Sequence, residues 1–479
     1  MTLVAAIVLS PLLAAFLLAF TPGLKRAAAL NIAASSAHFL LALTLLWAPH
    51  QSTALFLLDG FNIYLIILTT FVALTTSVFS AGYIATEVKE GKLNPLNLRF
   101  YHAMYQAFLF TMLLALSTNN LGVMWVAVEG ATLTTVLMVS LYRTPAAIEA
   151  AWKYFILCGV GIALALFGTI LMYMAAQPIM GPGMAAMTWT DLLGHVPRIN
   201  AGILNLAFVF LLVGYGTKVG LAPLHAWLPD AHAEGPTPIS AVLSGLLLNV
   251  ALYAVLRFKM LLAAHDEALA PGPLMIFMGL ATLALAGIML YRRRDVKRFF
   301  AYSSIEHMGL ITFAFGMGGP LANFAGLLHM TMHSLTKSAI FYAVGHAVQA
   351  RGSQQIADIR GLTVSHPALG WGLLLGVVAI SGLPPFGVFM SEFLLVTSTF
   401  ARTPWLAVPL TVGLLVAFSA LIMRAQQMCF GAPSMPQGRP LSGALVPLYA
   451  HLALVLLAGL WLPEPLVAWF RSVAALLGG

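Results

Sequence analysis

Long apolar runs recur along the whole length of this chain. They begin near Leu3, Ala28, Phe61, Ala103, Leu121, Ala150, Ile203, Ile239, Pro273, Phe299, Leu321, Leu369, Trp405 and Ala444. Each run supplies the roughly 20 mostly apolar residues that cross a bilayer as a helix. Charged residues are only 8% of the 479 positions, whereas a soluble globular protein carries about 25%. The sequence therefore predicts an all-α, polytopic membrane protein with about 14 transmembrane helices.

Cationic residues outside these runs are divided unevenly between two sets of loops. Odd-numbered loops carry Lys25, Arg26, Lys89, Lys92, Arg99, Arg143, Arg292, Arg293, Arg294, Lys297, Arg298, Arg351, Arg360, Arg424 and Arg439. Even-numbered loops carry only Arg198, Arg257, Lys259 and Arg402. Because positive residues accumulate in cytoplasmic loops, we expect both termini on the periplasmic side of a bacterial cytoplasmic (inner) membrane. The run from Met1 to Phe20 lacks a basic n-region and a small-residue cleavage site, so we expect a retained helix.

The loop cations also account for the net charge of +8. They form no extended basic face, which excludes nucleic acid as a partner. The two cysteines, Cys158 and Cys429, lie far apart within apolar runs, and no Cys/His cluster with metal-ligand spacing is present. We therefore expect no metal and no cofactor in this chain.

Three lysines, Lys153, Lys218 and Lys337, fall inside the apolar runs rather than in loops. Two later runs are interrupted by glycine and proline, at Gly220 and Pro223 in one and at Gly382, Pro384 and Pro385 in the other. In lipid, a helix interrupted by proline survives only where it faces protein or a wet cavity. Paired broken helices in the two halves of a chain indicate a transporter-type ion path.

The first candidate proton site combines Glu129 with Lys218. Glu129 lies in the middle of the fifth apolar run, where an unpaired carboxylate would cost several kcal/mol. Lys218 comes directly before the first helix break, and burial readily shifts a lysine towards losing its proton. We favour a proton-transfer pair over a structural hydrogen bond for Glu129 and over a snorkelling side chain for Lys218.

The second candidate site is built on one helical face. His329, His333 and Lys337 are spaced i, i+4 and i+8, so their side chains stack along one stripe. Histidine titrates near neutral pH, which favours a proton relay. A structural role and a metal site remain as alternatives, although no HExxH motif or further ligand accompanies the two histidines.

Further titratable residues surround the two breaks. Glu392 follows the second break, and we interpret it as a terminal proton site of the second half. Glu306 and His307 come after the basic loop of Arg292 to Arg298, and the sequence leaves open whether they join the relay or lie near the cytoplasmic interface. Asp230, with His232 and Glu234, follows the first break and forms either an entrance funnel or a loop cap; the cap is favoured.

Several motifs resemble one known family. They are Lys218 to Pro238, which includes Pro223-Leu224-His225-Ala226-Trp227-Leu228-Pro229-Asp230, then Arg294 to Ser304, and His329 to Lys337. These stretches are similar to the antiporter-like subunits of respiratory complex I, of Mrp-type cation/proton antiporters and of membrane-bound NiFe-hydrogenases. Within that family, Leu246 to Tyr253 and Ser304 to Gly309 are most similar to component F of hydrogenase-4.

The resemblance implies 14 core helices with two inverted five-helix repeats and breaks in helices 7 and 12. The corresponding divisions are 1–100 for helices 1–3, 101–260 for the first repeat, 261–430 for the second repeat and 431–479 for helix 14. It implies an ion pair between Glu129 and Lys218, a matching sixth-helix lysine at Lys153, and a central relay of His329, His333 and Lys337 that ends at Glu392. His225 and Asp230 lie in its most specific motif. Asn249 departs from the family, in which Lys or His is common at this position, and asparagine cannot carry a proton as a charge.

The resemblance further implies a proton-translocating subunit of a multisubunit membrane redox complex, of the hydrogenase-4, formate hydrogenlyase or complex I type. Redox chemistry would then occur on Ni–Fe and iron–sulfur centres in other membrane and peripheral subunits. The rival hypotheses are a subunit of a Mrp-type cation/proton antiporter, a membrane subunit of a proton-driven inorganic carbon uptake module with a zinc-binding soluble partner, and a structural anchor with a vestigial relay.

Overall fold

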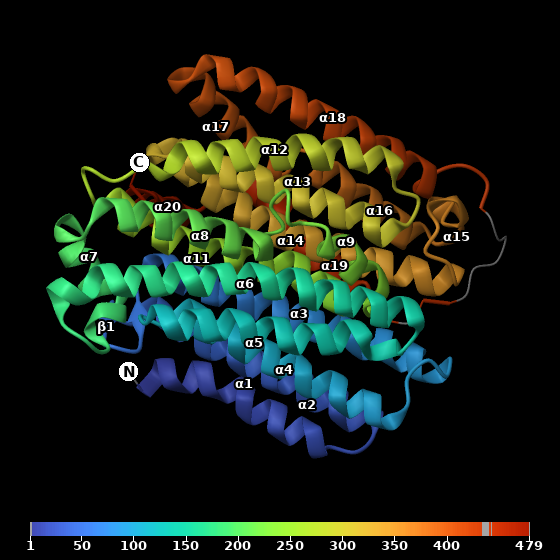
Figure 1. The fold of residues 1–479 in the computed structure, drawn as a ribbon. Coiled ribbons are helices and arrows are strands. Elements are labelled where there is room, and N and C mark those ends of the chain that lie inside the picture. Colours follow the sequence, from blue (N-terminus) through green and yellow to red (C-terminus); the bar gives the residue numbers. More distant parts are fainter. Residues whose placement is uncertain (1, 434–439, 442, 479) are drawn as a thin grey trace.

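The computed structural model describes residues 2–433, 440–441 and 443–478, and helices make up most of this part of the chain (Figure 1). The helices are α1 (Thr2–Phe20), α2 (Leu24–Leu43), α3 (Gly60–Lys89), α4 (Pro95–Ser117), α5 (Leu121–Val139), α6 (Pro145–Met180), α7 (Trp189–His195), α8 (Ala201–Val219), α9 (Trp227–Glu234), α10 (Thr237–Val242), α11 (Leu248–Ala263), α12 (Pro271–Arg292), α13 (Val296–Met317), α14 (Gly319–Arg351), α15 (Leu362–Ser365), α16 (Pro367–Ile380), α17 (Gly387–Arg402), α18 (Pro404–Cys429), α19 (Val446–Leu460) and α20 (Glu464–Leu476). The strands are β1 (Gln51–Ser52) and β2 (Leu57–Leu58), which pair antiparallel as one short hairpin.

The long helices run side by side in one bundle, as a chain of membrane-spanning segments requires (Figure 1). Within the described residues, ten helices are long and apolar enough to cross a membrane. Two more, α13 and α14, have sufficient length but carry polar side chains, because they lie in the interior of the bundle. Adding the broken pair α16–α17 and the pair α19–α20, which is bent by 82°, gives the 14 crossings that the sequence predicts.

Burial follows the position of each helix in the bundle. The segment Thr237–Ala263, which contains α10, α11 and the π-helical turn Leu243–Leu247 between them, is buried throughout its apolar window. The outer helices α1, α2 and α18 turn large apolar side chains outwards, where lipid would cover them. Close helix contacts rely on small residues, since a Cβ on Gly279 of α12 would lie 2.7 Å from the carbonyl oxygen of Gly309 of α13.

The chain ends and the basic loops lie at opposite ends of this bundle (Figure 1). The start of α1 and the end of α20 share one end, beside β1 and α7. The connections that carry Arg294 and Arg360 lie at the other end, beside α15. This arrangement agrees with the charge asymmetry of the loops. Arg439 falls outside the described residues.

Four cations that the sequence analysis places in loops are in fact buried in helices. Arg257 and Lys259 lie within α11, Lys297 lies in the first turn of α13, and Arg351 lies in the last turn of α14. The Lys297 Nζ donates to the carbonyl oxygens of Ala233 and Gly235, 2.8 and 2.7 Å away, and so satisfies acceptors at the C-terminal end of α9. The loop assignment was wrong for these residues because long cationic side chains can be buried where carbonyls or a carboxylate receive them.

Both predicted helix breaks are confirmed. Helix α8 ends at Val219 and α9 begins at Trp227, while α16 ends at Ile380 and α17 begins at Gly387. Gly220 and Gly382 have φ values of 86° and 67°, a left-handed conformation that favours glycine directly after a helix. Each break therefore leaves several backbone groups of a spanning helix available to side chains at bilayer depth.

Candidate functional site

The first group of buried polar residues joins α5 to the end of α8. Glu129 and Thr132 lie one helical turn apart on α5, and Lys218 lies in the last turn of α8. The Lys218 ammonium donates to the Thr132 hydroxyl, which in turn donates to the Glu129 Oε2 at 3.0 Å. Among the described residues, Lys218 and Glu129 make no direct ion pair. The hydroxyl thus connects the two charged groups that the resemblance implies as a pair.

Aromatic rings enclose this first group on the side of the break. The Lys218 Nζ, on a fully buried side chain, lies 5.3 Å from the centre of the Tyr154 ring. Tyr154 stacks on Trp227 of α9 with 4.5 Å between ring centres. The Trp227 indole donates to the carbonyl oxygen of Thr217, 2.8 Å away, which lies in the last turn of α8. The break therefore surrounds the buried Lys218 side chain with aromatic residues that contact one another and the end of α8.

The second group joins α13, α14 and α17. The His307 Nδ1 and the His329 Nε2 are 3.0 Å apart, and the His329 Nδ1 is 2.9 Å from the Ser391 hydroxyl. The Glu306 Oε2 lies 3.2 Å from the His307 Nε2. All of these side chains are buried. The structure thus brings Glu306 and His307 into the interior beside His329.

Glu392 borders a cavity of about 220 Å³ beside this second group. The cavity is also lined by Glu306, His307, Ser381 and Gly382. One donor atom from each of His307, His329 and Glu392 lies within 4.8 Å of the other two. The metal alternative in the sequence analysis pairs His329 with His333, four residues later. His333 and Lys337 do not belong to the trio of His307, His329 and Glu392. Several polar atoms around the cavity, including both Glu306 oxygens, lack hydrogen-bond partners within the described structure, and a cavity of this kind accommodates water.

Gly382 is required for the position of the Glu392 carboxylate. A Cβ at residue 382 would lie 1.9 Å from the Glu392 Oε2, and the φ of 67° disfavours any side chain there. We expect Gly382→Ala to displace Glu392 and to lower ion transport at least about tenfold, because the carboxylate leaves the cavity. Transport in reconstituted vesicles measures this effect. Gly159→Ala, at a position with no atom within 4 Å of the added Cβ, is the control and should leave transport unchanged.

Buried hydroxyl and amide groups also join α13 and α14 to α11 and to the π-helical turn before it. The Asn249 Nδ2 donates to the Ser334 hydroxyl at 2.8 Å, and the Ser244 and Ser304 hydroxyls are 2.6 Å apart. The Lys337 Nζ donates to the Phe300 carbonyl oxygen at 3.2 Å, and Ser304 donates to the same oxygen at 3.1 Å. Lys337 therefore shares a neutral acceptor with Ser304.

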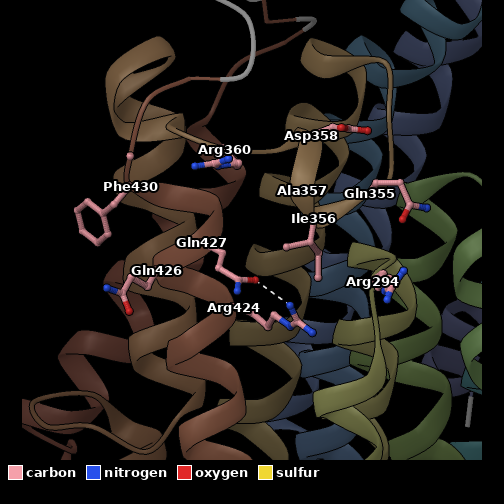
Figure 2. Close-up of a pocket in the computed structure, with 11 residues that line it drawn as sticks. Arg294, Gln355, Ile356, Ala357, Asp358, Arg360, Arg424, Gln426, Gln427 and Phe430 are labelled. Carbon is pink, nitrogen blue, oxygen red and sulfur yellow. Dashed lines mark hydrogen bonds between the residues drawn. The ribbon is translucent and has the colours of Figure 1, made fainter.

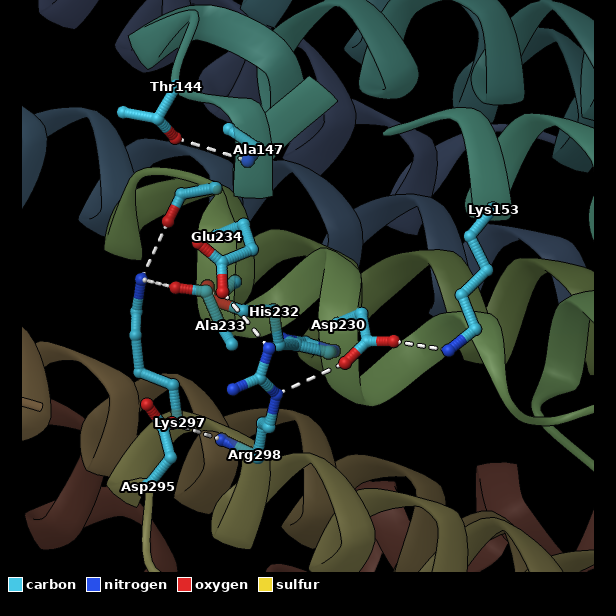
Figure 3. A network of polar contacts seen from close by, with 12 residues as sticks. Thr144, Ala147, Lys153, Asp230, His232, Ala233, Glu234, Asp295, Lys297 and Arg298 are labelled. Atoms are coloured by element: carbon cyan, nitrogen blue, oxygen red, sulfur yellow. Dashed lines mark hydrogen bonds and ion pairs between the residues drawn. The ribbon is translucent and has the colours of Figure 1, made fainter. Parts of the chain in front are cut away.

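Lys153 of α6 and Asp230 of α9 belong to a partly exposed network of ion pairs (Figure 3). The Lys153 Nζ is 2.5 Å from an Asp230 oxygen, and the other Asp230 oxygen is 3.1 Å from the Arg298 Nε. Arg298 also pairs with Glu234 at 3.0 Å. The Lys153 side chain is 43% exposed, so this network lies near the surface of the protein. His225 lies within the first break and packs edge-on against Tyr302.

Sequence analysis did not identify Thr132, Ser391, Ser244 or Ser304. Thr132 alone had a usable signal, because its i+3 spacing from Glu129 places both on one helical face. The other three hydroxyls meet their partners only through contacts between distant segments.

These two groups lie within the region that a known family covers. The family model described as NADH:quinone oxidoreductase/Mrp antiporter, TM matches residues 118–418, which is more than half of the chain. The chain belongs to this family. It is 57% identical over 473 residues to a hydrogenase-4 component F homologue of Methylacidiphilum infernorum (isolate V4), with 99% of both chains covered.

Solved structures agree with the family in fold. A chain of the membrane-bound sulfane sulfur reductase, an archaeal respiratory membrane complex, superposes with a TM-score of 0.88 at 22% identity and covers 100% of this chain and 98% of its own. A chain of respiratory complex I from Thermus thermophilus gives a TM-score of 0.82 at 24% identity and covers 99% and 100%. The predicted resemblance and the polytopic all-α fold are thereby confirmed: this is an antiporter-like membrane subunit.

Proposed function

We propose that this chain is a proton-translocating subunit of a multisubunit membrane redox complex of the hydrogenase-4 type. The observation that carries the proposal is the pair of buried polar groups, one beside each helix break. Charged side chains in the membrane interior persist only when they are paired or hydrated, and they commonly mark ion paths. The relative at 57% identity, a hydrogenase-4 component F homologue, supports the choice of complex.

In the first half, Lys218 and Glu129 would share a proton through the Thr132 hydroxyl. A hydroxyl that accepts from an ammonium and donates to a carboxylate can pass a proton by rotating and exchanging its own. If Lys218 lost its charge, the hydrogen bond from Thr132 to Glu129 would weaken. If Glu129 lost its charge, the hydrogen bond from Lys218 to Thr132 would weaken. Movement of Lys218 away from Thr132 would then separate the two charges and favour release of the proton.

In the second half, protons would pass among Lys337, His333, His307 and His329 and leave at Glu392. Imidazole serves this purpose because one ring nitrogen accepts while the other donates. The polar groups of Asn249, Ser334, Ser244 and Ser304 would support water between the halves. Asn249 would hold such water without itself becoming charged.

The redox reaction would occur outside this chain. Ni–Fe and iron–sulfur centres would lie in peripheral partner subunits, and a change of charge there would be transmitted along the buried groups. The chain would lie in a bacterial cytoplasmic membrane with its termini in the periplasm and the basic end in the cytoplasm. Lys153, with Asp230 and Arg298, would stabilise the first break at its cytoplasmic side.

Two measurements test this proposal. The complex is solubilised in mild detergent, purified by a tag on this chain and identified by mass spectrometry; hydrogenase-like and iron–sulfur subunits are expected. After reconstitution, substrate oxidation should acidify or alkalinise the vesicle interior without sodium. Companions that are all small membrane proteins, with sodium-dependent transport, would instead favour a Mrp-type antiporter, which the family description includes.

A further inference from the structure

A cavity of about 860 Å³ opens at the basic end of the bundle, and none of its lining residues belongs to either buried group (Figure 2). Three separate segments meet there: the connection between α12 and α13, the short helix Ile356–Asp358 with the connection to α15, and the end of α18. Each of them contributes one arginine to the lining, namely Arg294, Arg360 and Arg424. The lining therefore concentrates positive charge from parts of the chain that are distant in sequence.

These arginines have no acidic partner within the described residues. Arg424 donates to the Gln427 Oε1 at 2.8 Å and to the Tyr291 carbonyl oxygen at 2.9 Å, while its Nε is buried without a partner. The guanidinium groups of Arg294 and Arg360 make no hydrogen bond or ion pair in the described structure. Among the described residues of the lining, Asp358 is the one acidic residue, and it accepts from the Ser353 hydroxyl at 2.6 Å. The described lining therefore carries two more arginines than acidic residues.

The cavity borders an apolar surface that faces outwards. Phe430 lines the cavity at the end of α18 and packs edge-on against Trp371 of α16 with 6.3 Å between ring centres. Trp371 is 50% exposed, and Leu415, further along α18, is 60% exposed. Exposed aromatic residues at the end of an apolar helix surface are typical of the level of lipid headgroups. The arginines thus lie where the headgroup of a lipid would be. The outer surface of α18 lies where the acyl chains of that lipid would be.

We propose that this cavity binds the phosphate group of an anionic phospholipid. Guanidinium groups bind phosphate through paired, charge-assisted hydrogen bonds, and basic pockets between helices at the cytoplasmic face suit lipid headgroups. Arginines that serve only to set membrane topology need not line one shared cavity. The bound lipid would connect α18 to the connections before α13 and α15. This inference is independent of the proposed function.

The test compares two double variants in the purified complex. Arg294→Gln/Arg360→Gln removes two charges whose side chains have no partner among the described residues, so the fold should persist. Lys25→Gln/Arg26→Gln removes two charges from the first turn of α2 at the same end of the bundle and serves as the matched control. Native mass spectrometry then counts the lipid retained after transfer from nanodiscs of phosphatidylcholine with phosphatidylglycerol.

We expect the wild type and the control to retain phosphatidylglycerol, and the arginine variant to bind it at least about tenfold more weakly, since charge-assisted hydrogen bonds are lost. A second experiment adds inorganic phosphate to the complex in nanodiscs of phosphatidylcholine alone. It tests whether the cavity binds a free phosphate ion instead of a lipid headgroup. If inorganic phosphate binds at millimolar concentration with the same arginine dependence, the phosphate site stands and its ligand is soluble. Equal lipid retention with no phosphate binding, or loss of a protein subunit without loss of lipid, overturns the proposal.

Discussion

Lys218→Met should abolish proton movement through the reconstituted complex. The Lys218 ammonium is fully buried and donates to the Thr132 hydroxyl, which connects it to Glu129. Methionine has a similar length and fills the same apolar space without carrying a proton. The substitution also removes the cation that the Thr132 hydroxyl connects to Glu129. Vesicles with a pH-sensitive dye inside should therefore show no change above background.

Lys259→Met is the matched control, because Lys259 is also buried but, within the described residues, donates only to the carbonyl oxygen of Leu477, 3.5 Å away. It should transport protons at the wild-type rate. Thr132→Val tests the connecting hydroxyl and should slow transport while the complex still assembles. Wild-type transport in Lys218→Met would contradict the mechanism, and loss of assembly in that variant alone would favour the structural role.

The sequence predicts those features that depend on composition and local order. Apolar runs indicate the spanning helices, and the glycine–proline pairs indicate both breaks, because neither residue suits the interior of a helix. Lys218 and Lys337 stand out because a lysine within an apolar run is rare. These signals lie within short windows, so no knowledge of tertiary contacts is needed to read them.

Contacts between segments that are distant in the sequence could not be predicted from local patterns of residues. Glu306 and His307 lie near a basic loop in sequence, and only the packing of α13 against α14 shows that both are interior. Lys153 lies in an apolar run, yet α9 brings Asp230 to it near the surface of the bundle. Polar side chains in a membrane protein are satisfied by whichever partner the helix packing supplies.

A second strong effect is expected at Asp59, whose carboxylate forms a 2.7 Å ion pair with the buried Arg257. Asp59 is also the N-cap of α3 and accepts hydrogen bonds from the amides of Phe61 and Asn62. Asp59→Ala leaves the Arg257 charge buried without its carboxylate, which costs about 3–5 kcal/mol. Loss of the cap adds about 1 kcal/mol. The apparent Tm should therefore fall by roughly 5 °C in a thermal unfolding assay followed by size exclusion.

Two further variants separate the ion pair from the cap. Asp59→Asn keeps a good N-cap and removes the charge, so its loss of stability measures the ion pair alone. Asp59→Asn/Arg257→Leu removes both charges and should recover most of that loss, because a buried ion pair replaced by apolar groups is often close to neutral. The Arg257 guanidinium also lies 4.7 Å from the centre of the Trp189 ring and 4.9 Å from that of the Tyr253 ring. If Asp59→Asn is as stable as the wild type, these rings rather than the carboxylate stabilise the buried charge of Arg257. Rings at these distances attract a cation by about 2 kcal/mol when water is excluded, which is less than the expected effect of the carboxylate.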